Sequence, residues 1–224
     1  MDTNALRDAQ AGRSPSSEGT SHTDLLIACG AVGGPLFATL AAAQALTRDG
    51  FDLAHQPLSL LSLGPLGWVQ VASFVTTGIL ILAFAVGMRQ VLTGGTGRTW
   101  APLLMAISGA GLVAGGLFLP DPALGYPPGT PDAIPSDFSW HGSLHAAAPP
   151  LAFAALVACC LVFARRFLVD RRRGWAAYSG ATAVATLTLS AWPTQEGASI
   201  RLAVAILVTF AWTTLLALRL RSPV

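Results

Sequence analysis

Six long apolar segments alternate with short polar segments along this chain of 224 residues. Each apolar segment approaches or reaches the roughly 20 residues that a helix needs to cross the hydrocarbon core of a membrane. Backbone groups in that core must be satisfied internally, which favours helices over open strands. The pattern therefore predicts an all-α integral membrane bundle of six transmembrane helices. The predicted spans are residues 25–46, 68–88, 101–119, 144–163, 175–192 and 200–218.

Polar segments flank this membrane domain, which we assign to residues 24–219. Residues 1–23 are rich in Ser and Gly, and they lack the basic stretch and apolar core of a cleavable signal. We expect them to form a disordered tail. Residues 220–224 are expected to be a short C-terminal segment on the same side of the membrane.

The distribution of arginine predicts the orientation. The chain has no lysine, and eleven of its 13 basic residues fall on one side of six spans, with only Arg48 and Arg201 on the other. Basic loops resist translocation, so both termini are expected in the cytoplasm. The basic face suits anionic membrane lipids. Only 11% of the residues are charged, against about 25% in soluble domains, so we expect no basic soluble domain and no nucleic-acid partner.

The external connections contain two features. Pro57–Leu63 is apolar but too short to span, and we predict a short re-entrant or interfacial helix that begins at Pro57 and ends before Gly64. Residues 120–140 are rich in proline and should form an irregular external loop or cap.

Candidate chemistry gathers on the external side. His141 and His145 are four residues apart, a spacing that stacks both imidazoles on one face of a helix, and the prolines at 149 and 150 should kink that helix or restart it. His55 and Asp121 belong to other external segments at similar depth. We hypothesise that His55, Asp121, His141 and His145 converge.

Such a group would suit zinc or another divalent transition metal, which could activate water as a Lewis acid. Without a metal, the same residues could act as a general acid and base. The alternative is a hydrogen-bonded clamp that joins two external loops. Glu196 is a further catalytic candidate, and Asp137 and Arg201 are candidates for substrate binding, although Arg201 could equally pair with Glu196 or extend to lipid headgroups.

Small and polar residues also occur inside the spans. Gly30 and Gly34, and likewise Gly111 and Gly115, have the four-residue spacing that permits close helix packing. A set of polar side chains could line an internal path or form hydrogen bonds between helices: Gln44, Gln70, Ser73, Thr76 and Thr77.

The run from His55 to Trp68 (HQPLSLLSLGPLGW), followed by the stretch from His141 to His145, resembles the bacterial multi-pass membrane family catalogued as domain of unknown function 998. The resemblance covers roughly residues 24–218. It implies a six-helix membrane domain in a bacterial cytoplasmic membrane. No established reaction comes with the family, so no catalytic residue is implied.

Two functions remain open from the sequence. The external His, Asp and Glu residues favour a membrane enzyme that acts on a lipid-like or isoprenoid substrate, whose headgroup would lie at the same interface. The alternative is a non-catalytic protein, either a small transporter or a structural partner in a membrane assembly. The spans lack charges at mid-depth, which disfavours ion-coupled transport.

Overall fold

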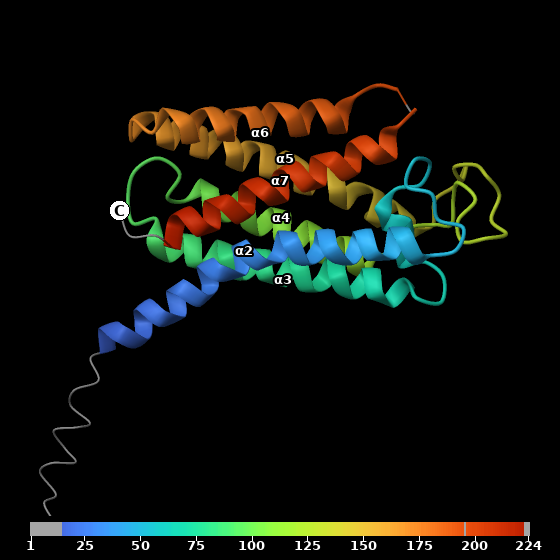
Figure 1. The fold of residues 1–224 in the computed structure, drawn as a ribbon, viewed down its shortest axis with the longest axis horizontal. Helices are drawn as coiled ribbons and strands as arrows, with labels where there is room; N and C mark the ends of the chain where they lie inside the picture. The colour runs from blue at the N-terminus through green and yellow to red at the C-terminus, as the bar shows by residue number, and fades with distance from the viewer. Residues whose placement is uncertain (1–14, 195, 222–224) are drawn as a thin grey trace, which may run out of the picture.

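Each long apolar run forms a helix in the computed structural model of the chain, which describes residues 15–194 and 196–221, with side chains from residue 22 onward. Within these residues there is no β-strand. The elements are α2 (Pro15–Thr47), the short 3-10 helix η1 (Leu58–Ser62), α3 (Gly67–Val91), α4 (Trp100–Leu117), α5 (Trp140–Val169), α6 (Arg173–Ala191) and α7 (Ala198–Arg221). The long helices lie side by side in an elongated bundle (Figure 1).

The six long helices form a closed ring. Each one packs against the next along the chain, and α7 returns to pack against α2. Successive helices run in opposite directions, so the connections 48–66, 118–139 and 192–197 gather at one end of the bundle and the connections 92–99 and 170–172 at the other (Figure 1). We call the first group of connections the cap. Arg48 and Arg201 lie at the cap end, whereas the other arginines of the described residues lie toward the opposite end.

Five of these helices are long and apolar enough to cross a membrane, in the segments His22–Thr47, Gly67–Val91, Trp100–Leu117, Trp140–Val169 and Ala198–Arg221. The helical membrane bundle predicted from the sequence is thus confirmed, with five rather than six helices meeting that standard. The remaining helix, α6, carries too many hydroxyl residues to meet it by composition.

The first helix is longer than the sequence predicts. It begins at Pro15, a residue that suits the first turn of a helix, and it continues without a break into the first apolar segment. Residues 15–23, which we expected to be disordered, are therefore helical, because each residue added to an existing helix gains a backbone hydrogen bond at little extra cost. Residues 1–14 and 222–224 lie outside the described residues.

Three of the four glycines in the predicted packing pairs sit at close helix contacts. A Cβ added at Gly30 would lie 2.5 Å from Cγ of Phe84, and one added at Gly34 would lie 2.7 Å from Cβ of Phe210. At Gly111 the nearest atom would be Cβ of Ala152, at 2.9 Å. Gly115 differs, because an added Cβ would meet nothing closer than Cδ1 of Phe74 at 4.0 Å. Open space therefore lies in front of Gly115.

Two of the five polar side chains expected to line a path or to bond between helices, Gln44 and Gln70, bond one helix to another, whereas the buried hydroxyls of Ser73 and Thr77 have no partner among the described residues. Nε2 of Gln44 donates to Oε1 of Gln70 over 2.7 Å and joins α2 to α3, with both side chains buried. Nε1 of Trp212 donates to Oγ of Ser179 over 3.0 Å and joins α7 to α6.

The cap is tied together by side-chain contacts. Nε2 of Gln56 donates to the carbonyl oxygen of Leu124 over 2.7 Å, which links the first connection to the second. Oγ of Ser199 donates to the carbonyl oxygen of His55 over 3.1 Å, which links the first connection to the start of α7. The short helix predicted from Pro57 is present as η1, and its Leu60 and Leu61 are buried against the end of the bundle.

Candidate functional site

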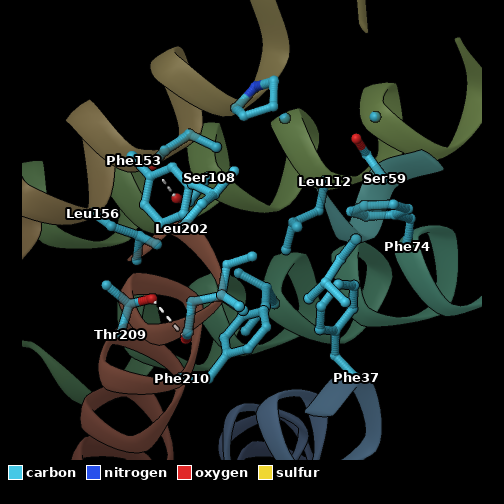
Figure 2. Close-up of a pocket in the computed structure, with 18 of the residues that line it drawn as sticks. Phe37, Ser59, Phe74, Ser108, Leu112, Phe153, Leu156, Leu202, Thr209 and Phe210 are labelled. Carbon is cyan, nitrogen blue, oxygen red and sulfur yellow. Dashed lines mark hydrogen bonds between the residues drawn. The ribbon is translucent and has the colours of Figure 1, made fainter. Parts of the chain in front are cut away.

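A cavity lies inside the helix ring, between α2, α3, α4, α5 and α7, with η1 at its cap end. Its volume is about 90 Å³, counted as space open to the centre of a water molecule. Figure 2 shows its wall as mostly aromatic and aliphatic, with the rings of Phe37 and Phe210 on one side and Ser108, Leu112 and Phe153 on the other.

The cavity exists because small residues face it from α4 and α5. Ser108, Gly111 and Gly115 recur at three- and four-residue intervals along α4, which places them on one face of that helix. Pro149 and Ala152 line the cavity from α5. Gly111 packs closely against Ala152, whereas the space in front of Gly115 is not filled by α5, and this space forms part of the cavity.

The cavity is elongated along the bundle axis. On α5 its lining runs from His145, close to the cap end, to Leu156 deeper in the ring. Eleven residues of α-helix correspond to roughly 16 Å at 1.5 Å per residue. On α7 the lining runs from Ser199 to Thr213. A long, narrow, apolar space of this kind fits a chain-like molecule better than a compact polar one.

His145 is the ionisable residue of the cavity wall. Nδ1 lies 2.7 Å from the carbonyl oxygen of Phe118, just beyond the end of α4, where helix carbonyls have no partner within their own helix. The residue is only 6% exposed. The carbonyl of Gly115 also lies near the ring, yet Nε2 is buried and has no hydrogen-bond partner among the described residues.

The other buried polar groups of the wall already have partners. Oγ of Ser108 donates to the carbonyl oxygen of Ala152 over 2.7 Å, and the hydroxyls of Thr209 and Thr213 donate to carbonyl oxygens of their own helix over 2.9 Å. Among the cavity-lining side chains that the structure describes, His145 is the one with a buried polar atom that lacks a partner.

His141 does not join His145 at the cavity. Its ring is exposed and stacks on Trp140, with ring centroids 3.5 Å apart, whereas His145 is buried. The prediction that the two imidazoles act together from one face is therefore corrected. The reason is that four residues advance a helix by slightly more than one turn, and His141 lies in the first turn, beside the cap rather than inside the ring. The helix continues through the prolines at 149 and 150 without a break.

The remaining two members of the predicted group have partners of their own. Nε2 of His55 lies 2.6 Å from Oδ1 of Asp132, and both side chains are largely exposed. Oδ2 of Asp121 accepts a hydrogen bond from the backbone N–H of Ser139 over 2.9 Å. Ser139 in turn caps α5 by accepting from the N–H of Gly142, so the Asp121 carboxylate lies at the positive end of the α5 dipole.

The four residues therefore do not form the shared metal site that we hypothesised. Within residues 15–194 and 196–221, no three or more His, Cys, Asp and Glu side chains are grouped so that they could hold a metal ion. A zinc ion shared by the four residues does not fit this arrangement, because each side chain has a different partner. His55 contacts Asp132 and His141 stacks on Trp140, whereas Asp121 and His145 contact backbone groups.

Of the other candidates, Arg201 stabilises the cap. The guanidinium of Arg201 donates to the carbonyl oxygens of Thr194 and Glu196 and so braces the turn before α7. Of the two alternatives left open for Arg201, it thus bonds Glu196, but through the backbone rather than the carboxylate. The side chains of Glu196 and Asp137 are exposed, and none of these residues lines the cavity.

Comparison with known proteins gives one match. The model of a family described as "Protein of unknown function (DUF998)" matches residues 31–219, a range that includes the cap and nearly all of the helix ring. No curated protein and no solved structure matches the chain.

Proposed function

The chain belongs to the DUF998 family of proteins of unknown function, and on that premise we propose that it is an inner-membrane protein that binds a lipid-like or isoprenoid molecule in the cavity. The observation that carries this proposal is the pairing of an elongated apolar space with one buried, unpartnered polar atom on His145. Most ligand sites combine an apolar wall with a few polar groups that fix orientation. The surrounding bilayer supplies molecules of this chemistry.

The same arrangement gives a catalytic form of the proposal. A neutral imidazole can act as a general base towards a hydroxyl or an activated water within hydrogen-bond reach. His145 is placed for this role, since it combines a free ring nitrogen with a position near the cap end of the cavity.

A structural role is the second candidate, and contacts in the cap favour it. His55 bonds Asp132, Asp121 bonds the start of α5, and Arg201 bonds two carbonyls. These are the contacts of a clamp between loops. A rigid cap of this kind would also suit a partner subunit in a larger membrane assembly.

We also propose six membrane crossings with both termini in the cytoplasm. Three of the hydroxyl residues that lower the hydropathy of α6 are buried against the other helices, Ser179, Thr182 and Thr186, whereas Thr188 and Ser190 near its end are exposed. The side chains that α6 exposes include Val184 and Leu187, which are compatible with lipid. α6 also runs alongside α5 for most of its length (Figure 1). The excess of arginine at the end away from the cap supports a cytoplasmic location for that end.

Cysteine labelling tests this topology, in a background in which Cys29, Cys159 and Cys160 are replaced. With six crossings, Ser136→Cys and Thr194→Cys should react with a membrane-impermeant maleimide in intact cells, and Asp170→Cys should react only after lysis. Labelling at position 194 tests whether α6 crosses the membrane. If position 194 behaved like position 170, then α6 would not cross and the topology would be overturned.

Photo-crosslinking tests the binding function. We expect a diazirine-bearing dodecanol probe to label the purified protein saturably at the cavity, on peptides that contain Leu112, Phe153 or Leu202. Unlabelled dodecanol should compete for that labelling. Non-saturable labelling of exposed residues such as Leu187 provides the internal control for simple partition into the detergent or lipid around the protein. Labelling confined to such exposed residues would contradict the proposal.

A further inference from the structure

We infer that the molecule bound in the cavity carries a hydroxyl group that donates a hydrogen bond to Nε2 of His145. The inference rests on the proposed function and names its ligand more closely, as a single-chain alcohol, straight or isoprenoid. It follows from the hydrogen bond that His145 already makes and from the absence of any other buried, unpartnered polar atom among the described side chains of the cavity wall.

The first step is the tautomer of His145. The carbonyl oxygen of Phe118 can only accept a hydrogen bond, so Nδ1, which lies 2.7 Å from it, must carry the proton. A neutral imidazole has one N–H, and Nε2 is then left with a lone pair and no proton. The unpartnered atom is therefore an acceptor, and it requires a donor from the ligand.

The second step excludes an anionic headgroup. No Arg or Lys is among the residues that line the cavity. The nearest cap arginines, Arg48 and Arg201, bond backbone carbonyls of the cap. The hydroxyls of Ser108, Thr209 and Thr213 already donate hydrogen bonds to helix carbonyls. The hydroxyl of Ser59 has no hydrogen-bond partner among the described residues, so the wall offers an anion one neutral donor and no countercharge. A carboxylate or phosphate needs several donors or a countercharge, whereas a hydroxyl supplies the donor that His145 needs.

The third step concerns the apolar part. A cavity volume of about 90 Å³ suits one chain rather than the two chains of a membrane phospholipid. His145 lies towards the cap end of the lining, so the hydroxyl would lie there and the chain would extend past Leu112 towards Leu156. The rings of Phe37, Phe74 and Phe210 would contact it along the other side (Figure 2).

Competition against the diazirine-bearing dodecanol probe tests the inference. Dodecanol and dodecyl methyl ether have the same acceptor oxygen, but only the alcohol can donate. In the wild-type protein we expect the alcohol to compete about tenfold better than the ether, a ratio that corresponds to about 1.4 kcal/mol. Dodecanoate, which is ionised in mildly alkaline buffer, should compete less well than the alcohol.

Variants of His145 test whether this residue causes the preference for the alcohol over the ether. In His145→Phe the ratio of alcohol to ether should fall to about one, because the ring keeps its bulk and loses its acceptor. His145→Gln should retain part of the preference, since its amide can donate to Phe118 and still present an oxygen. His141→Phe is the matched control, and its ratio should equal that of the wild type because His141 lies outside the cavity.

Each outcome has one meaning. Absence of saturable cavity labelling in the wild type would overturn the proposed function itself. Equal competition by alcohol and ether, with labelling intact, would overturn only the inference about the hydroxyl. Stronger competition by dodecanoate would also overturn it, since that result requires a second proton on the imidazole. If His145→Phe cannot be isolated, His145→Gln takes its place, and an alcohol-to-ether ratio equal to that of the wild type in this variant would overturn the assignment to His145.

Discussion

Replacement of Gly115 with Leu should abolish binding of an apolar chain in the cavity while leaving the bundle folded. A Cβ at this position meets nothing closer than 4.0 Å, so the Leu side chain has room to grow into the cavity and fill it. Leu is also a better helix former than Gly, which is about 0.8–1.0 kcal/mol less favourable than Ala within a helix, and this helps to preserve α4. We expect saturable labelling of the cavity to fall at least about tenfold, a loss of about 1.4 kcal/mol or more in binding free energy.

Gly180→Leu is the control for this substitution. Gly180 also lies within a helix, a Cβ added there meets no atom within 4 Å, and it does not line the cavity. The same glycine-to-leucine change at that position should leave labelling unaltered. A folded Gly115→Leu protein that still showed saturable labelling at Leu112 or Phe153 would place the ligand elsewhere.

Replacement of Gly78 with Ala should give a large loss of stability for a one-carbon change. A Cβ at Gly78 would lie 2.6 Å from Cγ2 of Val113 and 2.7 Å from the carbonyl oxygen of Gly109, so α3 and α4 would have to separate. Backbone atoms cannot move aside as a flexible side chain can. Overpacking of this kind typically costs about 1–3 kcal/mol.

Thermal unfolding in detergent measures this effect. The melting temperature of Gly78→Ala should fall by several degrees, whereas Gly180→Ala should melt at or slightly above the wild-type temperature, because alanine is the better helix former and meets no neighbour there. Equal melting temperatures for the two variants would show that α3 and α4 do not cross as closely as described.

The helices were predictable from the sequence because the bilayer imposes a simple requirement. A segment in hydrocarbon must be apolar and must satisfy its own backbone, so the runs before Arg48 and Arg89 could be assigned as helices with confidence from composition alone. The same requirement predicted the short helix after Pro57, since an apolar stretch of that length can be buried only at the end of a bundle. Boundaries were harder. α5 begins at Trp140 rather than at residue 144, because Ser139 caps it five residues before the apolar run starts.

The partners of the external polar residues were not predictable from depth alone. Asp121, Asp132 and Asp137 all occur in one loop, and nothing in their spacing distinguishes the one that meets His55. That pairing depends on how two cap connections fold against each other through Gln56 and Tyr126. A shared depth in the membrane therefore indicated the correct end of the molecule but not the correct contacts.

The cavity was missed for a related reason. Gly111 and Gly115 have identical sequence signatures, and both were interpreted as packing residues. Ala152 fills the space opposite Gly111, whereas nothing fills the space opposite Gly115. The difference belongs to the neighbouring helix. The sequence did contain one indication of the cavity, the recurrence of Ser108, Gly111 and Gly115 on one face of α4. A row of small side chains leaves a space wherever the neighbouring helix does not fill it.

The closure of the ring has a consequence for biosynthesis. Every other pair of neighbours in the ring is joined by one connection, whereas α2 and α7 lie far apart in the sequence and still meet each other, so α2 leaves the ribosome well before α7 does. Until α7 inserts, the space between α2, α4 and α5 is a groove with one wall missing, and it faces the acyl chains of the bilayer. The arrival of α7 closes that groove around whatever chain occupies it at that moment. On the proposed function, the cavity could therefore take up its first ligand as α7 inserts.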